Sequence, residues 1–211
     1  MSLRVNEIYF SIQGESSHAG LPCVFVRLTG CNLRCIWCDT EYAFYEGDWK
    51  SLDQIVAEAA QFGCKLVELT GGEPLLQKES FALVDKLIEA GFKVLIETSG
   101  SISLEQLNPE AIKIMDIKCP GSQMAHKNYW ENIDYLTPKD EVKFVLADRR
   151  DYDFAVNFIR AHALPGKINL SPVFGKLHPR DLAEWILADG LDVRLGLQIH
   201  KFIWDPAARG V

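Results

Sequence analysis

Residues 29–40 read T-G-C-N-L-R-C-I-W-C-D-T and place Cys31, Cys35 and Cys38 in one short segment. Thiolates this close together can share one metal centre. A structural zinc ion takes four protein ligands, and no fourth Cys or His follows at the usual short spacing. A cubane of four irons held by three cysteines leaves one iron open to a substrate or cofactor. The segment therefore favours an open [4Fe–4S] cluster.

Two other interpretations of the three cysteines remain open on these residues alone. Positions i, i+4 and i+7 share one helical face, and free cysteine is often buried, so one alternative is a helix with three core cysteines. The other is zinc binding or redox disulfide chemistry. The neighbours Gly30, Asn32 and Asp39 are poor residues for a helix interior, which argues against the first alternative.

The composition indicates one domain with a sizeable core. The 211 residues are 48% hydrophobic and carry a formal net charge of −7, with Lys and Arg scattered along the chain. We therefore expect a single domain over residues 1–211, and neither nucleic acid nor a membrane as a partner. The first ten residues lack a signal-peptide pattern. Six cysteines without an export signal predict a cytoplasmic protein whose thiols serve as ligands.

Strand-like and helix-like patterns alternate along the chain. Strands are predicted at residues 5–10, 24–28, 66–70, 94–97, 112–118, 142–146, 168–170 and 193–199, and helices at 51–62, 80–90, 152–163 and after Pro179. Residues 100–111 leave little room for a crossover helix. We predict an α/β fold, a partial, modified TIM-like barrel of mostly parallel strands with some helices shortened or missing. Its site is expected at the C-terminal ends of the strands.

Several polar residues fall near these strand ends. The sequence G-G-E-P at 71–74 follows a buried strand, and its glycines allow a ligand close to the backbone. Arg27 interrupts an apolar strand just before the cysteines, where its planar fork can bind a carboxylate or simply reach solvent. Asp116 and Lys118 end another strand, either as residues of the barrel mouth or as a surface ion pair.

The cysteine spacing CxxxCxxC, Trp37 before the last cysteine, and the later G-G-E-P resemble the motifs of the radical S-adenosylmethionine (SAM) superfamily. The resemblance implies that a [4Fe–4S] cluster chelates the amino and carboxylate groups of SAM at its fourth iron. It also implies that reductive cleavage of SAM yields a 5′-deoxyadenosyl radical, which abstracts hydrogen from the substrate.

Further motifs resemble those of the 7-carboxy-7-deazaguanine synthase family across essentially the whole chain. They are E-I-Y-F-S-I-Q-G-E, E-T-S-G, D-I-K-C-P and the C-terminal Q-I-H-K-F-I-W-D-P-A-A-R-G-V. This resemblance implies conversion of 6-carboxy-5,6,7,8-tetrahydropterin to 7-carboxy-7-deazaguanine with loss of ammonia, in the biosynthesis of queuosine-type 7-deazapurines. It also implies an electron donor such as a flavodoxin or ferredoxin, and a homodimer.

Two rival functions share part of this pattern. A radical SAM activating enzyme that installs a glycyl radical on a partner protein has a short barrel and CxxxCxxC, but the I-Q-G-E opening and the R-G-V end argue against it. A non-catalytic iron–sulfur or zinc-binding module would leave G-G-E-P and Arg27 without a role.

The resemblance also implies roles for individual residues. Cys31, Cys35 and Cys38 are the implied cluster ligands, and Thr40 matches the position that binds Mg²⁺ in the family. The implied pterin-site residues are Ile12, Gln13, Gly14, Glu15, Arg27, Thr70 and, through the terminal carboxylate, Val211. The implied SAM contacts are Trp37, Gly72, Ser99, Lys118 and Ser171. No general acid or base is implied; Glu15, His200 and Lys201 are unranked candidates.

Overall fold

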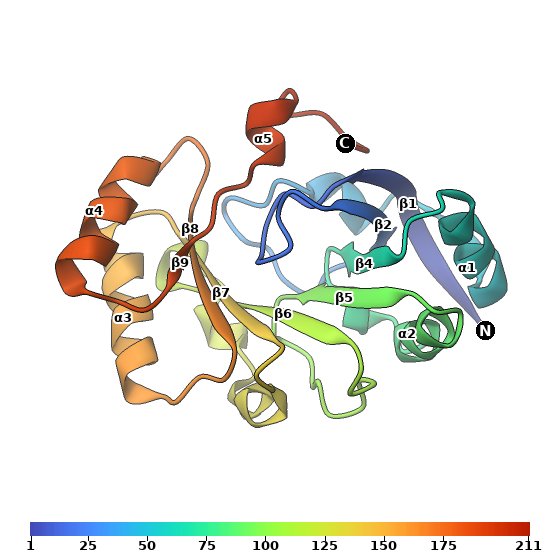
Figure 1. The fold of residues 1–211 in the computed structure, drawn as a ribbon, viewed down its shortest axis with the longest axis horizontal. Coiled ribbons are helices and arrows are strands. Elements are labelled where there is room, and N and C mark those ends of the chain that lie inside the picture. Colours follow the sequence, from blue (N-terminus) through green and yellow to red (C-terminus); the bar gives the residue numbers. More distant parts are fainter.

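The computed structural model describes residues 1–211 and contains one nine-stranded sheet in the order β3-β1-β2-β4-β5-β6-β7-β8-β9 (Figure 1). The strands are β1 (Ser2–Ile12), β2 (Pro22–Leu28), β3 (Asp48–Ser51), β4 (Leu66–Gly71), β5 (Lys93–Thr98), β6 (Ile112–Ile117), β7 (Glu141–Leu146), β8 (Lys167–Pro172) and β9 (Arg194–Leu195). All pairs from β2·β4 to β8·β9 are parallel, whereas β1 runs antiparallel to β2 and β3. The edge strands β3 and β9 do not pair, so the predicted partial barrel is confirmed as an open one.

The helices cluster toward the two ends of this curved sheet. They are α1 (Leu52–Gln61), α2 (Ser80–Glu89), α3 (Arg149–Ala161), α4 (Pro179–Asp189) and the short α5 (His200–Ile203). Figure 1 shows α1 and α2 beside one end of the sheet and α3 and α4 beside the other. No helix joins β5 to β6, and only the 3₁₀ turns η3 (Pro120–Ser122), η4 (Ala125–Lys127) and η5 (Trp130–Tyr135) lie between β6 and β7. The prediction of missing and shortened helices is therefore confirmed.

Side-chain alternation along the strands separates a core from a site. Val67 and Leu69 of β4 belong to the large hydrophobic core that also contains Ile55 of α1 and Leu83 of α2. The opposite face of the sheet carries a small apolar cluster and, beyond it, a row of charged residues. The apolar residues of that cluster are Cys23, Phe25, Leu66, Leu95 and Ile114. Toward the C-terminal ends of the strands the same face presents Arg27, Glu68, Glu97, Asp116 and Lys143.

Local signals explain most element boundaries, but one strand was predicted too long and another was missed. The Ser51 side chain accepts from the Gln54 backbone and the Gln54 side chain from the Ser51 backbone, so a capping box begins α1 at the start of the predicted helix 51–62. The strand expected at 193–199 is only β9, because the chain turns after Leu195 and forms α5 at its end. The edge strand β3, a polar D-W-K-S segment, was not predicted.

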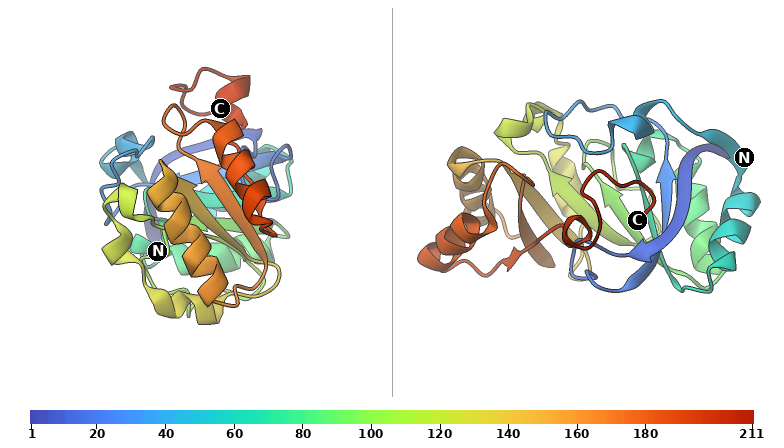
Figure 2. Two further views of the ribbon diagram at one scale, coloured as in Figure 1. Left: turned by 90° about the vertical axis from the view of Figure 1, so that its left-hand side faces the viewer. Right: turned by 90° about the horizontal axis from the view of Figure 1, so that it is seen from above.

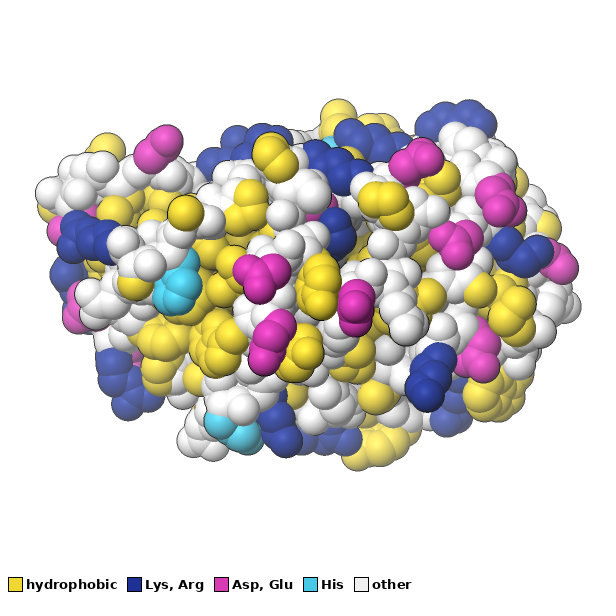
Figure 3. All heavy atoms as spheres, turned by 90° about the horizontal axis from the view of Figure 1, so that it is seen from below, with side chains coloured by type: hydrophobic (Ala, Val, Ile, Leu, Met, Phe, Trp, Pro, Cys, Tyr) yellow, Lys and Arg dark blue, Asp and Glu magenta, His cyan; other side chains and the backbone are white.

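No helix combines the length and apolar character needed to cross a membrane. Figure 3 shows one face of the molecule, on which acidic, basic and hydrophobic side chains are interspersed rather than gathered by sign.

Candidate active site

A cavity of about 650 Å³ lies at the C-terminal ends of the parallel strands. Its size is typical of a small-molecule site, and its place is the one at which barrels of this kind hold their ligands. Every residue predicted above for the cluster, magnesium, SAM and the pterin lines this cavity, with the exception of Ser171. Segments from almost the whole chain thus converge on one space.

The cysteine segment runs between β2 and the 3₁₀ turn η1 (Glu41–Phe44) and has no helical structure. Cys31, Cys35 and Cys38 are partly exposed, carry free thiols and line the cavity. The alternative of three core cysteines on one helix is therefore wrong. Gly30 at the start of the segment has φ +99°, a left-handed conformation that glycine adopts without strain.

The second glycine of G-G-E-P allows the loop after β4 to pack directly on the cysteine segment. A Cβ at Gly72 would lie 2.5 Å from the Gly30 carbonyl oxygen and 2.6 Å from Cys31 Cβ. The Glu73 backbone N–H donates to the same Gly30 carbonyl at 2.9 Å. This close approach brings the G-G-E-P loop beside Cys31, where a cofactor bound at the cysteines has backbone next to it.

The donor set fits an iron–sulfur cluster better than a single metal ion. No three His, Cys, Asp or Glu side chains converge as ligands of one ion. In a cubane cluster each cysteine binds a different iron, so the three cysteine sulfurs do not need to converge on one metal ion. Burial raises the pKa of the Cys31 and Cys35 thiols, so cluster assembly has to release their protons.

The Glu73 carboxylate joins the G-G-E-P loop to the end of β5. It is fully buried and accepts from the Ser99 backbone N–H at 2.7 Å and from the Thr98 hydroxyl at 2.9 Å. The Ser99 hydroxyl donates to it as well. Glu73 therefore fixes the position of Ser99 at the cavity wall, a role that the sequence alone did not indicate.

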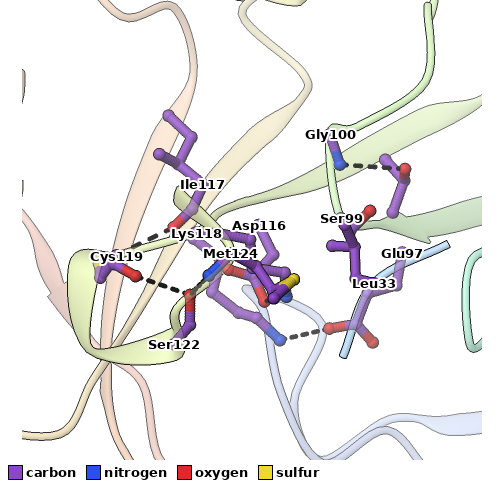
Figure 4. A network of polar contacts seen from close by, with 12 residues as sticks. Leu33, Glu97, Ser99, Gly100, Asp116, Ile117, Lys118, Cys119, Ser122 and Met124 are labelled. Carbon is purple, nitrogen blue, oxygen red and sulfur yellow. Dashed lines mark hydrogen bonds and ion pairs between the residues drawn. The ribbon is translucent and has the colours of Figure 1, made fainter. Parts of the chain in front are cut away.

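Asp116 and Lys118 form an ion pair inside the cavity rather than at the surface. Lys118 Nζ lies 2.6 Å from Asp116 Oδ2, and both side chains are largely buried. Burial would lower the pKa of Lys118, but the Asp116 carboxylate raises it above its usual range. Figure 4 shows the pair close to Ser99 and Glu97. The other oxygen of Asp116 is buried without a hydrogen-bond partner, and can accept from a ligand in the cavity.

Arg27 lines the cavity and is held by groups from β1 and η1. Its Nε donates to Glu7 Oε1 at 2.8 Å and its Nη2 to the Tyr9 hydroxyl at 3.0 Å. Burial raises the pKa of Tyr9 to about 12, so the phenol stays neutral beside the guanidinium. Arg27 is thus a buried, oriented cation, and a surface position for it is ruled out by its small exposure.

A second buried charge network lies on the same wall of the cavity. Lys143 Nζ of β7 donates to Glu15 Oε2 at 2.6 Å and also pairs with Glu97 of β5. Gln13 donates through its side chain to Glu68 of β4. Burial raises the pKa of Glu68 well above its usual range, and the neighbouring carboxylates of Glu97 and Glu15 raise it further. Sequence reasoning named Gln13 and Glu15 but missed Glu68, Glu97 and Lys143, whose only signal was a charged residue within a mostly apolar strand.

The C-terminal segment closes part of the cavity. The Ile199 backbone N–H donates to the Gly14 carbonyl at 2.9 Å, and Lys201 pairs with Asp39 at 2.6 Å. A Cβ at Gly14 would lie 2.1 Å from His200 Nδ1, so the imidazole rests on that glycine. Figure 2 shows the segment crossing in front of the strands in the view from above. Val211 at the end of the chain lines the cavity.

Thr40 and Ser171 differ in their relation to the cavity. Thr40 lines it, and its hydroxyl lies 3.7 Å from Cys38 Sγ, so a hydroxyl ligand stands next to the cysteines. Magnesium keeps most of its water or substrate ligands, so one protein hydroxyl fits this ion. Ser171 is buried beside Gly196, at which a Cβ would lie 2.7 Å from Ser171 Oγ, and it is not part of the lining. Its contact with SAM stays a prediction.

Comparisons with known proteins agree with this geometry. The model of the radical SAM superfamily matches residues 25–116. The chain is 50% identical to the 7-carboxy-7-deazaguanine synthase of Koribacter versatilis, over 99% of this chain and 100% of that one. It is 44% identical to the enzyme of the same name from Chlorobaculum tepidum, over 99% of this chain and 97% of that one. The crystal structure of QueE from Escherichia coli shares the fold, with a TM-score of 0.76, 24% identity, and coverage of 93% of this chain and 94% of that one.

Proposed function

Because this chain belongs to the 7-carboxy-7-deazaguanine synthase family, we propose that it converts 6-carboxy-5,6,7,8-tetrahydropterin to 7-carboxy-7-deazaguanine with loss of ammonia. It is then a carbon–nitrogen lyase of the radical SAM class that serves the biosynthesis of queuosine-type 7-deazapurines. One observation supports the proposal above all others. The cysteines, the G-G-E-P loop, Arg27 and the I-Q-G-E segment, which are far apart in sequence, line one cavity.

The residues present fit the cofactors of this reaction. Cys31, Cys35 and Cys38 would hold the [4Fe–4S] cluster, and Thr40 would bind Mg²⁺. SAM would lie against Trp37, Gly72, Ser99, Lys118 and Ser171. When bound, the cluster and SAM supply the one-electron reduction and the hydrogen abstraction that start the reaction.

The chain's own residues orient the substrate. Arg27 offers its guanidinium to the substrate carboxylate, which it can bind with two parallel hydrogen bonds once its contacts with Tyr9 and Glu7 adjust. Gln13, Glu15 and Thr70 line the same part of the cavity, where carboxylate and amide oxygens can accept from the ring N–H groups of a pterin. Ile12, Gly14 and Val211 complete this part of the lining. Positioning of this kind, which sets one carbon beside the cofactor, is the main contribution the protein makes to a radical step.

The C-terminal segment helps to exclude water from the reaction. Residues 205–211 line the cavity, and the Arg209 guanidinium lies 3.9 Å from the centre of the Tyr42 ring. His200 rests over the I-Q-G-E segment, and burial lowers its pKa, so this imidazole is neutral near pH 7. The neutral imidazole can accept a proton during the loss of ammonia. Glu15 and Lys201 are the other candidates for proton transfer.

The proposal includes partners and a compartment. An electron donor such as a flavodoxin or ferredoxin would reduce the cluster, and six free cysteines suit the reducing cytoplasm. A homodimer is supported by exposed aromatic residues, since Phe10 and Phe62 stack at 5.9 Å on the surface and remain exposed to solvent.

A turnover experiment separates this function from that of a glycyl-radical activating enzyme. The reconstituted protein, with a reductant, SAM, Mg²⁺ and the carboxytetrahydropterin, should form product with no second protein present. Cleavage of SAM that requires a protein partner, without product from the pterin, would point to the activating enzyme instead.

A further inference from the structure

Lys143 is a buried cation with two carboxylate partners from different parts of the chain. Only 6% of its side chain is exposed, and it lies on β7, between β6 and β8, with its ammonium group at the cavity wall. It donates to Glu15 at 2.6 Å and pairs with Glu97. None of the roles assigned above uses Lys143.

Glu15 does not belong to a helix or a strand. It lies in the loop between β1 and β2, and the next residue, Ser16, has φ +60°, an unusual left-handed conformation for a non-glycine residue. Apart from Lys143, the contact that orients its carboxylate is a hydrogen bond from Gln198 at 2.8 Å. Gln198 belongs to the C-terminal segment, which is itself partly exposed. The ammonium group of Lys143 is therefore the one contact of the Glu15 carboxylate that comes from the sheet.

The same contact determines the ionisation of Glu15. Burial would raise the pKa of Glu15, but the charge and hydrogen bond of Lys143 lower it to about 2. Glu97, Glu68 and His200 also face this group, from β5, β4 and α5. Glu68, which has no cation of its own, shows the opposite behaviour, because burial raises its pKa well above the usual range.

On the basis of the proposed function, we infer that Lys143 is a positioning residue that holds Glu15 toward the cavity as an ionised hydrogen-bond acceptor for the substrate ring. A tetrahydropterin presents an amino group and ring N–H groups. An ionised carboxylate accepts through both oxygens, whereas a protonated one uses part of that capacity to donate. Loss of the lysine frees the loop, and it raises the pKa of the Glu15 carboxyl, which favours the protonated form.

Binding is the direct test, with the fluorescent analogue 6-carboxypterin as the probe. Lys143→Met should weaken binding by about tenfold, the size expected for a charge-assisted hydrogen bond. Lys113→Met is the matched control. Lys113 of β6 forms a comparably buried ion pair with Asp140 at 2.9 Å, but it does not line the cavity. The control should lose stability yet bind the probe as the parent does.

The pH dependence gives a second readout that a purely structural role would not produce. In the parent, Glu15 stays ionised throughout because its pKa is about 2. In Lys143→Met this pKa rises, so binding should weaken relative to the parent as the pH falls from 8 to 5.5. Taking the ratio to the parent at each pH removes the part of the His200 titration that the two proteins share, and His200→Gln in both backgrounds removes the rest.

A double-mutant cycle shows whether Lys143 acts through Glu15. Glu15→Gln removes the negative charge that pairs with Lys143. The double variant Glu15→Gln/Lys143→Met removes both charges of this pair, so neither is left buried without the other. Lys143→Met should then cost less than about threefold in this background. An equal loss of binding in both backgrounds, or an equal loss in Lys113→Met, would overturn the inference. If the parent itself neither binds the probe nor forms product, the proposed function has failed instead.

Discussion

The Glu73 carboxylate accepts a hydrogen bond from the Ser99 backbone N–H at 2.7 Å and so joins the loop after β4 to the end of β5. Ser99 is thereby held at the cavity wall on the side where SAM is proposed to bind. In the proposed site, Glu73 therefore supports SAM binding through Ser99 without touching the cofactor itself.

Glu73→Gln is expected to loosen this connection. The amide nitrogen of glutamine cannot accept from Ser99 N–H or from the hydroxyls of Thr98 and Ser99, so a buried donor loses its partner. We expect a loss of about 1–3 kcal/mol in the free energy of unfolding and a weaker affinity for SAM. Chemical denaturation and SAM binding measure the two effects. Unchanged SAM affinity in a destabilised variant would limit Glu73 to a structural role.

Cys35→Ala should abolish the cluster and SAM cleavage together, because two cysteines cannot replace three as ligands. Iron and sulfide content, the brown colour of the reconstituted protein, and release of 5′-deoxyadenosine are the measurements. Cys64→Ala is the control, since Cys64 lies before β4 and does not line the cavity. A Cys35→Ala protein that keeps its cluster would remove the cysteine assignment.

Thr40→Ala should weaken the response to Mg²⁺ while the cluster stays intact. The hydroxyl is the one magnesium ligand proposed from the chain, and the ion would otherwise depend on water and substrate oxygens. Initial rates across a Mg²⁺ titration give the comparison, with Thr137→Ala as the control because Thr137 bonds to Asp140 and does not line the cavity. Identical titrations for Thr40→Ala and the parent would exclude Thr40 from the site.

Arg27→Ala should raise the KM for the carboxytetrahydropterin far more than the KM for SAM. A charge-assisted contact to the substrate carboxylate of about 1.5–3 kcal/mol corresponds to a rise of roughly 10- to 150-fold. The substitution also leaves Glu7 without its cation. Glu7→Gln controls for that loss, because it separates the ion pair but keeps Arg27. If both substitutions raise the same KM equally, Arg27 acts through the pair and not on the substrate.

The fold followed from sequence where the signals were local. The alternation of β4, α2 and β5 predicted mostly parallel strands, and the lack of space for a helix in residues 100–111 predicted a partial barrel with some helices missing. The short strand β3 was missed because D-W-K-S has no apolar alternation and pairs only through the backbone of β1. β9 was predicted too long because residues 196–199 are apolar in part, yet they turn to cross the site instead of extending the sheet.

Site residues that belong to a recognisable sequence motif could be predicted. Residues that act through a neighbouring side chain could not. Cys31, Arg27 and Gly72 carry recognisable patterns, and all line the cavity. Lys143 and Glu97 do not, because each reads as one charged position in an apolar strand. Their meaning depends on the strand order, which places β5 and β7 on either side of β6. That order is a property of the whole sheet and not of any segment.

The central claim is that this cavity turns a carboxytetrahydropterin into a deazaguanine by radical SAM chemistry. The most direct test is anaerobic: the protein is reconstituted with iron and sulfide, reduced, and supplied with SAM, Mg²⁺ and 6-carboxy-5,6,7,8-tetrahydropterin, and the products are followed by mass spectrometry. The account predicts 7-carboxy-7-deazaguanine together with ammonia. Cleavage of SAM by a protein with an intact cluster, without this product, would contradict it.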